Sequence, residues 1–351
     1  MRELLSWTGS AWIATVPDAP ALHNLRAAGA VVCPMEGLDG ISALLVVGPN
    51  HERLPYSSAD RRLIQDSGSE IGAILRRSET YKRDALCDHQ AAQAILDRMT
   101  PANSPNVEGI ECFGQCERSG NLGGDFFDIA RLISGGLLVV AGTLNLEGMV
   151  GAILLTGLQT RLRSRWKHEE ELGPLNEEMN KILCDIAPEN ACASVFSAFI
   201  DAPRRRLHYI NAGDQAALLI RTNGTARRIE PSAAVLGLSR GSKYKVRTAE
   251  FAPGDTLIAA SDGITEAQGP MGARFGDHRI LQVLKKHADS KVHEVAGELI
   301  SSVQAFTAER TDATSTDRTV VLARYTPCSH SMSPRLNAPQ TLKLHASAGA
   351  A

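Results

Sequence analysis

The chain has 351 residues, of which 43% are hydrophobic and 22% charged, with a formal net charge of −2. This is the composition of an ordinary globular protein long enough for two domains. The balanced charge argues against a nucleic-acid partner or an anionic membrane surface. The longest apolar run, residues 149–158, is about half of the roughly 20 residues that a membrane span needs. The opening residues lack a signal-peptide pattern, so we expect no membrane association and a cytoplasmic location.

The seven cysteines are scattered along the chain without a paired Cys-x-x-Cys spacing. An odd, scattered set is typical of reduced thiols in a cytosolic protein. Cys112 and Cys116 are near neighbours, but no histidine or further cysteine stands beside them, which argues against a zinc site. The cysteines therefore predict neither a disulfide framework nor a metal centre.

The first predicted elements are a β-hairpin and a helix. Two short apolar runs, near residues 30–34 and 41–47, flank a Gly/Asp turn. The stretch PYSSADRRLIQ follows, and either Ser57 or Ser58 can cap a helix there. Apolar residues then continue at helical spacing until prolines at 101 and 105 end the pattern. We therefore expect one long helix between the N-terminal segment and the rest of the chain.

The apolar positions along this connecting helix have two interpretations. Its apolar positions recur mostly at steps of three, four and seven residues, and they are Ile74, Tyr81, Ala85, Ala92, Ile95 and Met99. This spacing is that of a parallel dimer seam. Polar residues at 78 and 88 interrupt the seam, as they would in a solvated spacer helix. The sequence leaves both a homodimer and a monomeric spacer open.

Beyond the prolines, strands and helices are interleaved. Gly, Asn, Asp and Pro separate the short apolar strands between residues 194 and 263, which suggests an antiparallel meander. Helices between runs of strands predict an α+β sandwich. The other expected strands are 107–116, 124–132, 136–141 and 318–325, and the expected helices are 148–165, 173–183 and 293–307. The polar, aperiodic tail at 326–351 is predicted to be disordered.

Acidic side chains stand at the ends of three predicted strands. Asp125 and Asp128 lie in GGDFFD, Asp262 and Glu266 in SDGITE, and Asp317 in TSTDRT. Such carboxylates are the ligands that magnesium or manganese prefers, because these hard cations take oxygen donors. Each turn alone is more typical of an ordinary Asp-Gly turn, so the order of the three carries the signal.

Several motifs occur in an order that resembles the metal-dependent PPM-type protein phosphatases, in the bacterial branch similar to stage II sporulation protein E. They are GGDFFDI, VVAGTLNLEGMVGAIL, LHYINAGD, PSAAVLGL, GDTLIAASDGITEA and TDRTVVLAR. The resemblance covers about residues 96–325 and implies an αββα sandwich of two mainly antiparallel sheets. The earlier stretch YSSADRRLIQDSGSEIGAIL resembles the end of a GAF sensor domain.

The resemblance implies four segments. A partial GAF-like α/β sensor domain would cover residues 1–77, a linker helix 78–104, the phosphatase-like domain 105–325 and a disordered tail 326–351. Only about the second half of a GAF domain fits before the linker.

The activity implied by the resemblance is hydrolysis of phosphoserine or phosphothreonine by a water molecule that bridges two Mg or Mn ions. Carried over residue by residue, Asp125 and Asp262 match acids of the family's catalytic metal site. Asp128 and Asp317 are further candidate ligands.

Two acids of the family pattern are missing. Thr143 stands where the family has the aspartate that bridges both ions, and Thr316 replaces the first of its terminal aspartate pair. Asp214 replaces the histidine of the NAGH segment. Two cations held close together need anionic ligands to offset their mutual repulsion, and a threonine hydroxyl supplies no charge. The expected metal site is therefore eroded.

Three functions remain open from the sequence. The chain is either a phosphatase that acts on a phosphorylated regulatory protein, such as an anti-sigma-factor antagonist, or a pseudophosphatase that binds such a partner without hydrolysis. A third alternative is a ligand sensor in which the GAF-like segment binds a small molecule.

Overall fold

A computed structural model of the chain describes residues 31–38, 40–48, 56–120, 122–165, 172–308 and 316–326. Contacts within the chain group it into two compact units, 1–94 and 95–351. The predicted tail at 326–351 and the start of the predicted sensor segment lie almost wholly outside the described residues. Among the helices that the structure does describe, none combines the length and apolar character needed to cross a bilayer.

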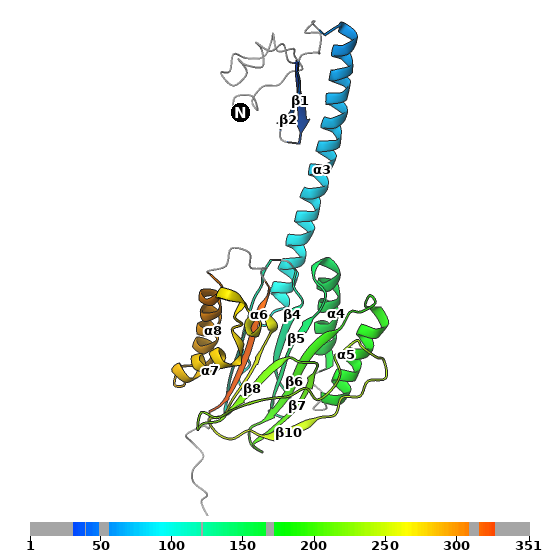
Figure 1. Cartoon of the computed structure of the whole chain (residues 1–351). Helices are drawn as coiled ribbons and strands as arrows, with labels where there is room; N and C mark the ends of the chain where they lie inside the picture. The colour runs from blue at the N-terminus through cyan, green and yellow to red at the C-terminus, as the bar shows by residue number, and fades with distance from the viewer. Residues whose placement is uncertain are drawn as a thin grey trace, which may run out of the picture. The chain divides into compact units, whose positions relative to one another are not determined.

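The N-terminal unit contains the predicted hairpin and the first part of the predicted long helix. Strand β1 (Val31–Gly37) pairs antiparallel with β2 (Gly40–Val47), and helix α3 runs without a break from Ser58 to Met99 over 42 residues (Figure 1). Ser57 caps the helix: its hydroxyl accepts the Asp60 amide, and the Asp60 carboxylate accepts the Ser57 amide in return. The helix therefore runs through residues 77 and 78, where the sequence placed a domain boundary.

The C-terminal unit is built on two five-stranded sheets. Their strand orders are β10-β7-β6-β5-β4 and β3-β12-β11-β8-β9, with every pairing antiparallel. The strands are β3 (Ile110–Glu117), β4 (Asp125–Arg131), β5 (Leu137–Leu144), β6 (Ala193–Asp201), β7 (Arg206–Ala212), β8 (Ala216–Ile220), β9 (Ala226–Arg228), β10 (Arg247–Glu250), β11 (Thr256–Ala260) and β12 (Arg318–Tyr325).

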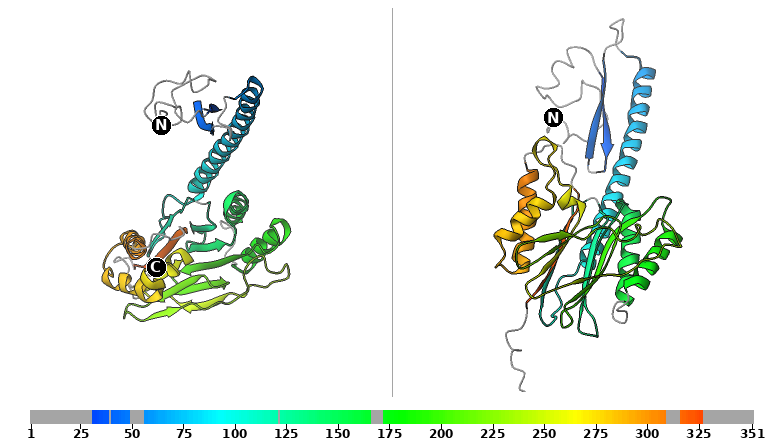
Figure 2. Two further views of the ribbon diagram at one scale, coloured as in Figure 1. Left: turned by 45° about the horizontal axis from the view of Figure 1, so that its top comes forward. Right: turned by 60° about the horizontal axis from the view of Figure 1, so that its bottom comes forward.

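Helices cover the two outer faces, so the predicted αββα sandwich is confirmed (Figures 1 and 2). Helices α4 (Gly148–Arg165) and α5 (Leu172–Ile186) lie on the β4–β7 side, and α7 (Gly276–Lys286) and α8 (Val292–Thr307) lie on the β3–β12 side. A short helix, α6 (Asp262–Thr265), and a 3₁₀ turn at Pro270–Gly272 connect β11 to α7. Helix α7 was not predicted from the sequence, because it buries only two apolar side chains, Ile280 and Leu284.

The main core lies between the two sheets. Phe127 and Ile129 of β4 pack in one cluster with Leu257 of β11 and Val321 of β12. Alternate residues of these strands point outward, and those of the second sheet form another cluster with α7 and α8. Both faces of the central strands are therefore buried.

Burial on both faces explains why the predicted single meander is wrong. The strands between 193 and 260 do not form one meander, because β6 and β7 belong to one sheet and β8, β9 and β11 to the other. Strand β11 is buried at every residue and shows no polar alternation. Such a strand does not reveal from its sequence which sheet it joins.

Substitution of Gly124 tests how closely the backbone before β4 approaches the end of β5. A Cβ atom at this position would lie 1.9 Å from the Leu144 carbonyl oxygen. We expect Gly124→Ala to lower the free energy of unfolding by about 1–3 kcal/mol, because that oxygen belongs to paired backbone and cannot move aside. The matched control is Gly157→Ala in α4, where a Cβ meets nothing within 4 Å. It should raise stability by about 0.5–1 kcal/mol. Urea denaturation measures both, and equal effects would contradict this packing.

Candidate active site

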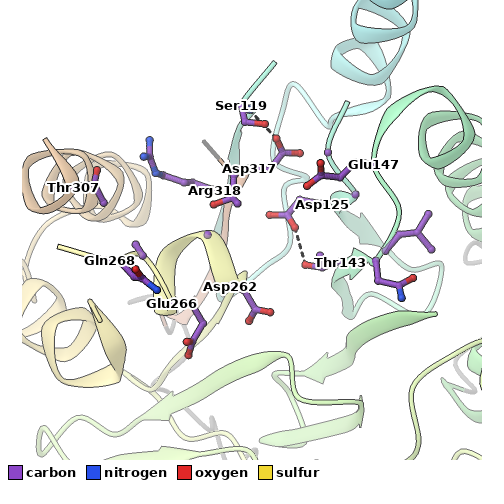
Figure 3. A pocket seen from close by; sticks show the side chains of 17 residues that line it. Ser119, Asp125, Thr143, Glu147, Asp262, Glu266, Gln268, Thr307, Asp317 and Arg318 are labelled. Atoms are coloured by element: carbon purple, nitrogen blue, oxygen red, sulfur yellow. Dashed lines mark hydrogen bonds between the residues drawn. The ribbon is translucent and has the colours of Figure 1, made fainter. Parts of the chain in front are cut away.

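The ends of four strands bring the predicted acids to one pocket. Asp125 at the start of β4 pairs in register with Thr143 near the end of β5. Asp262 directly follows the turn after β11, and Asp317 directly precedes β12, which pairs with β11. Because paired antiparallel strands end and begin at the same edge, these side chains surround one cavity of about 590 Å³ (Figure 3). Its lining includes Asp125, Thr143, Leu144, Glu147, Asp262, Gly263, Glu266, Ala267, Thr316, Asp317 and Arg318.

Asp125 is one of two buried acids of this pocket, with 4% of its surface exposed. Its Oδ1 accepts a hydrogen bond of 2.7 Å from the Thr143 hydroxyl, as Figure 3 shows. Its Oδ2 is buried and has no hydrogen-bond partner among the described residues. Burial raises the pKa of Asp125 to about 6, although the neighbouring Ser261 and Thr143 side chains act in the opposite direction. The site therefore holds a buried carboxylate with one oxygen outside hydrogen-bond geometry.

Asp262 lies in the exposed turn that opens α6. Partial burial of its carboxyl group raises the pKa of Asp262, and repulsion from Glu266 and Asp214 raises it further. The glycine of the SDG motif permits the close approach of the next strand, because a Cβ at Gly263 would lie 1.8 Å from the Asp317 carbonyl oxygen. The turn is thus fixed against the start of β12.

Asp317 is buried, and each of its two carboxylate oxygens has a partner within the protein. Its Oδ1 accepts the Ser119 amide at 2.8 Å, and its Oδ2 lies 3.4 Å from the Arg118 guanidinium. The side chains of Arg118 and Asp317 are 7% and 3% exposed, so the pair is shielded from solvent. Asp317 therefore has an internal counter-charge, and it does not need a metal ion to balance it.

Arg118 was not identified from the sequence. Its guanidinium also donates to Thr100 Oγ1 at 3.2 Å and to the Leu96 carbonyl at 3.5 Å, and it lies 3.4 Å from Asp97. These three groups belong to the end of α3 and the residue after it. No local pattern signals this role, because Arg118 and Asp317 are 199 residues apart in the chain.

The sequence made Asp128 a candidate metal ligand, but Asp128 does not line the pocket. It is three residues beyond Asp125 on β4, so its side chain emerges on the opposite face of the sheet. There it binds the Arg163 guanidinium at 2.6 Å and the Gln159 amide at 3.2 Å. Burial raises the pKa of Asp128 to about 6, while Arg163 acts to lower it. This acid anchors α4, with Arg163 also bound to the Met99 carbonyl.

The remaining sequence candidates lie at or near the pocket. Thr316 lines it and is exposed, with a neutral hydroxyl where the resemblance places an acid. Asp214 is close enough to Asp262 to affect its pKa, and its own carboxylate pairs with Arg228 at 3.4 Å. Glu266 forms an ion pair with Arg274.

These residues do not fit the two-ion centre implied by the resemblance. Among the residues that the structure describes, no group of three or more His, Cys, Asp or Glu side chains could hold a metal ion. The Thr143 hydroxyl donates a hydrogen bond to Asp125, and Asp317 is held by Arg118 and Ser119. Asp125 Oδ2 and the exposed Glu147 and Asp262 carboxylates remain as anionic donors, and they do not form a group that could hold a metal ion.

The chain is similar in sequence to one protein family and to a longer cyanobacterial protein. The family model of stage II sporulation protein E matches residues 137–326. Protein IcfG from Synechocystis sp. is 23% identical over 250 residues, which are 61% of this chain and 39% of IcfG. The chain therefore spans well under half the length of this relative.

Two solved structures share the fold. The RsbU and RsbW domains of Rv1364c from Mycobacterium tuberculosis match with a TM-score of 0.57 and 20% identity, over 65% of this chain and 63% of that one. The PP2C phosphatase domain of SpoIIE from Bacillus subtilis, solved with a fragment of its regulatory domain, matches with a TM-score of 0.53 and 18% identity. That match covers 63% of this chain and 64% of the other.

Burial of Asp125 predicts a pH-dependent stability. Its folded pKa of about 6 lies above the unfolded value of about 3.9, so ionisation costs the folded state stability as pH rises through this interval. At pH 7 we expect Asp125→Asn to be more stable than the native chain by up to about 3 kcal/mol. The difference should shrink to nothing below about pH 4, where aspartate is protonated in both states.

Melting temperatures between pH 4 and 8 measure this effect. Glu147→Gln is the matched control, because it neutralises an exposed carboxylate of the same pocket. It should change the melting temperature little at any pH. A stability gain for Asp125→Asn that persists unchanged at pH 4 would contradict the assignment to a raised pKa.

Proposed function

This chain belongs to the stage II sporulation protein E family, and we propose that it binds a regulatory protein partner at the pocket without hydrolysing phosphate. The family is one of metal-dependent serine/threonine protein phosphatases, whose homologues bind magnesium or manganese. The proposal is therefore that this member retains the fold and has lost the reaction.

One observation carries the proposal. The Thr143 hydroxyl donates to Asp125 Oδ1 at 2.7 Å, at the position where the resemblance places an acid that bridges both ions. An aspartate at 143 would bring a second negative charge against Asp125, an arrangement that needs a cation or a shared proton between the two carboxylates. Threonine removes that charge and satisfies Asp125 by a hydrogen bond. This local arrangement is stable without metal.

A regulatory protein is the partner that the family relationship supports. The resemblance implies a phosphorylated regulatory protein, such as an anti-sigma-factor antagonist, as the substrate of an active member. One structural relative joins an RsbU and an RsbW domain in a single protein. We propose that the present chain recognises a protein of that regulatory class.

A weak phosphatase is the second candidate. Asp125 and Asp262, the two acids that match the family's catalytic site, line the same pocket. Sensing of a small ligand by the N-terminal segment stays a prediction, because only the hairpin and α3 of that segment are described.

We further propose that α3 pairs with its copy in a homodimer. Large apolar side chains remain exposed along it, with Ile74 64%, Tyr81 61% and Ile95 51% exposed. They continue the seven-residue spacing predicted from the sequence. At the end of the helix the seam is interrupted, because Ala92 is buried and the Met99 carbonyl binds Arg163. The pairing face would therefore centre on Ile74 and Tyr81, and Ile95 would lie beyond it.

Restoring the two missing acids tests the proposed loss of reaction. We expect the native chain to show no manganese-dependent hydrolysis of p-nitrophenyl phosphate. The double variant Thr143→Asp, Thr316→Asp should gain about 100-fold or more, equal to about 3 kcal/mol of transition-state stabilisation, because both carboxylates supply charge to the ions. Each single variant should gain much less, since the ligands act as one unit.

The matched control is Thr143→Asn with Thr316→Asn, which has nearly the same shape and no added charge. It should show neither turnover nor a manganese-dependent rise in melting temperature, whereas the aspartate double variant should show both. Native turnover equal to that of the aspartate variant, and abolished by Asp262→Ala, would refute the proposal and favour the phosphatase candidate.

The dimer proposal is tested by light scattering coupled to size exclusion. The native chain should have the mass of a dimer at concentrations of about 10 μM or higher, and Ile74→Lys with Tyr81→Lys should convert it to a monomer because charges cannot pack in the seam. The control Lys82→Arg keeps the charge of an exposed position on the same helix. A native chain that is monomeric at all concentrations would leave α3 as a spacer.

A further inference from the structure

The pocket is strongly acidic for a site that would receive a phosphoprotein. Five carboxylates line it, with Arg318 as the one basic side chain among the described lining residues; the acids are Asp125, Glu147, Asp262, Glu266 and Asp317. Arg318 is itself paired with Glu117 at 2.8 Å. Without metal ions, a phosphate dianion entering this cavity would meet mainly like charges. The electrostatics therefore favour a cation over a phosphoryl group.

The two buried acids of the pocket differ in one respect. Asp317 has a buried guanidinium partner, that of Arg118, and a backbone amide on its other oxygen. Asp125 is equally buried, yet its Oδ2 has no hydrogen-bond partner within the described part of the chain. A buried carboxylate oxygen left unpaired costs free energy that a donor of positive charge would recover. The internal Arg118–Asp317 pair shows the kind of group that fits.

The walls of the cavity suit a long side chain with a charged head. Ala267 contributes partly exposed apolar surface to the lining, while the Glu147 and Asp262 carboxylates are exposed beside it. Lysine and arginine lay an aliphatic stem along apolar surface and keep the cation at the tip. A cavity of about 590 Å³ is large enough for such a side chain.

We propose that this pocket receives a lysine or arginine side chain of the protein partner, with its cationic group between Asp125 and Asp262. The inference rests on the proposed function, because a working two-metal site would hold phosphate in the same place. It assigns the partner's contact residue as basic and makes a phosphoserine contact at this position unfavourable.

The test is a titration of the full chain, without metal, followed by backbone amide resonances in NMR. The probes are N-acetyl-L-arginine amide, its neutral isostere N-acetyl-L-citrulline amide and N-acetyl-phosphoserine amide. We expect the arginine probe to shift the resonances of pocket residues such as Leu144 and Gly263. It should bind at least about tenfold more tightly than either other probe, and added salt should weaken it.

Two variants separate a specific site from general attraction to negative charge. Asp262→Asn changes an exposed turn, and Asp125→Asn changes the buried acid, so a folding defect in one leaves the other informative. Each should weaken arginine binding about tenfold or more. The control Glu230→Gln removes an exposed acid that does not line the pocket, and it should leave binding unchanged.

The outcomes distinguish this inference from the proposed function. Citrulline binding as tight as arginine binding, or tighter binding of the phosphoserine probe, would overturn the basic-contact inference alone. Arginine binding that survives both pocket variants would do the same. Manganese-dependent phosphate hydrolysis by the native chain would instead overturn the proposed function.

Discussion

The packing of two antiparallel sheets fixes where each acid of the pocket lies. Strands β4 and β5 in one sheet and β11 and β12 in the other begin or end at the same edge of the sandwich. At that edge backbone approaches so closely that Gly124 and Gly263 leave no room for a side chain. The pocket is therefore a product of sheet packing.

The charge on these acids must then be balanced locally. A metal centre would balance it with cations, but this chain uses other means at each position. Thr143 replaces a charge with a hydrogen bond to Asp125, Arg118 pairs with Asp317, and Asp262 stays in contact with solvent. Asp125 Oδ2 is the exception, which is why the pocket retains a capacity for one more positive group.

The end of α3 is joined to the sandwich by two arginines that each also bind a buried acid. Arg118 connects the Leu96 carbonyl and Thr100 to Asp317 of the pocket, and Arg163 connects the Met99 carbonyl to Asp128 beneath α4. Cationic groups are favourable at a helix C-terminus, where the carbonyl groups lack partners. The last turn of the helix is thus part of the C-terminal unit, and Arg118 links it to Asp317, which lines the pocket.

The sequence by itself determined the α+β class, the hairpin, α3, α4 and the order of motifs, because periodicity, capping residues and strand-end acids are local signals. It also marked Thr143 and Thr316 as neutral where acids were expected. Only the tertiary structure decided that Asp128 lies outside the pocket, that β6–β7 and β8–β11 divide between two sheets, and that Arg118 pairs with Asp317. These facts depend on which face or which distant residue a side chain meets, and fully buried strands and contacts between residues 199 apart leave no local pattern.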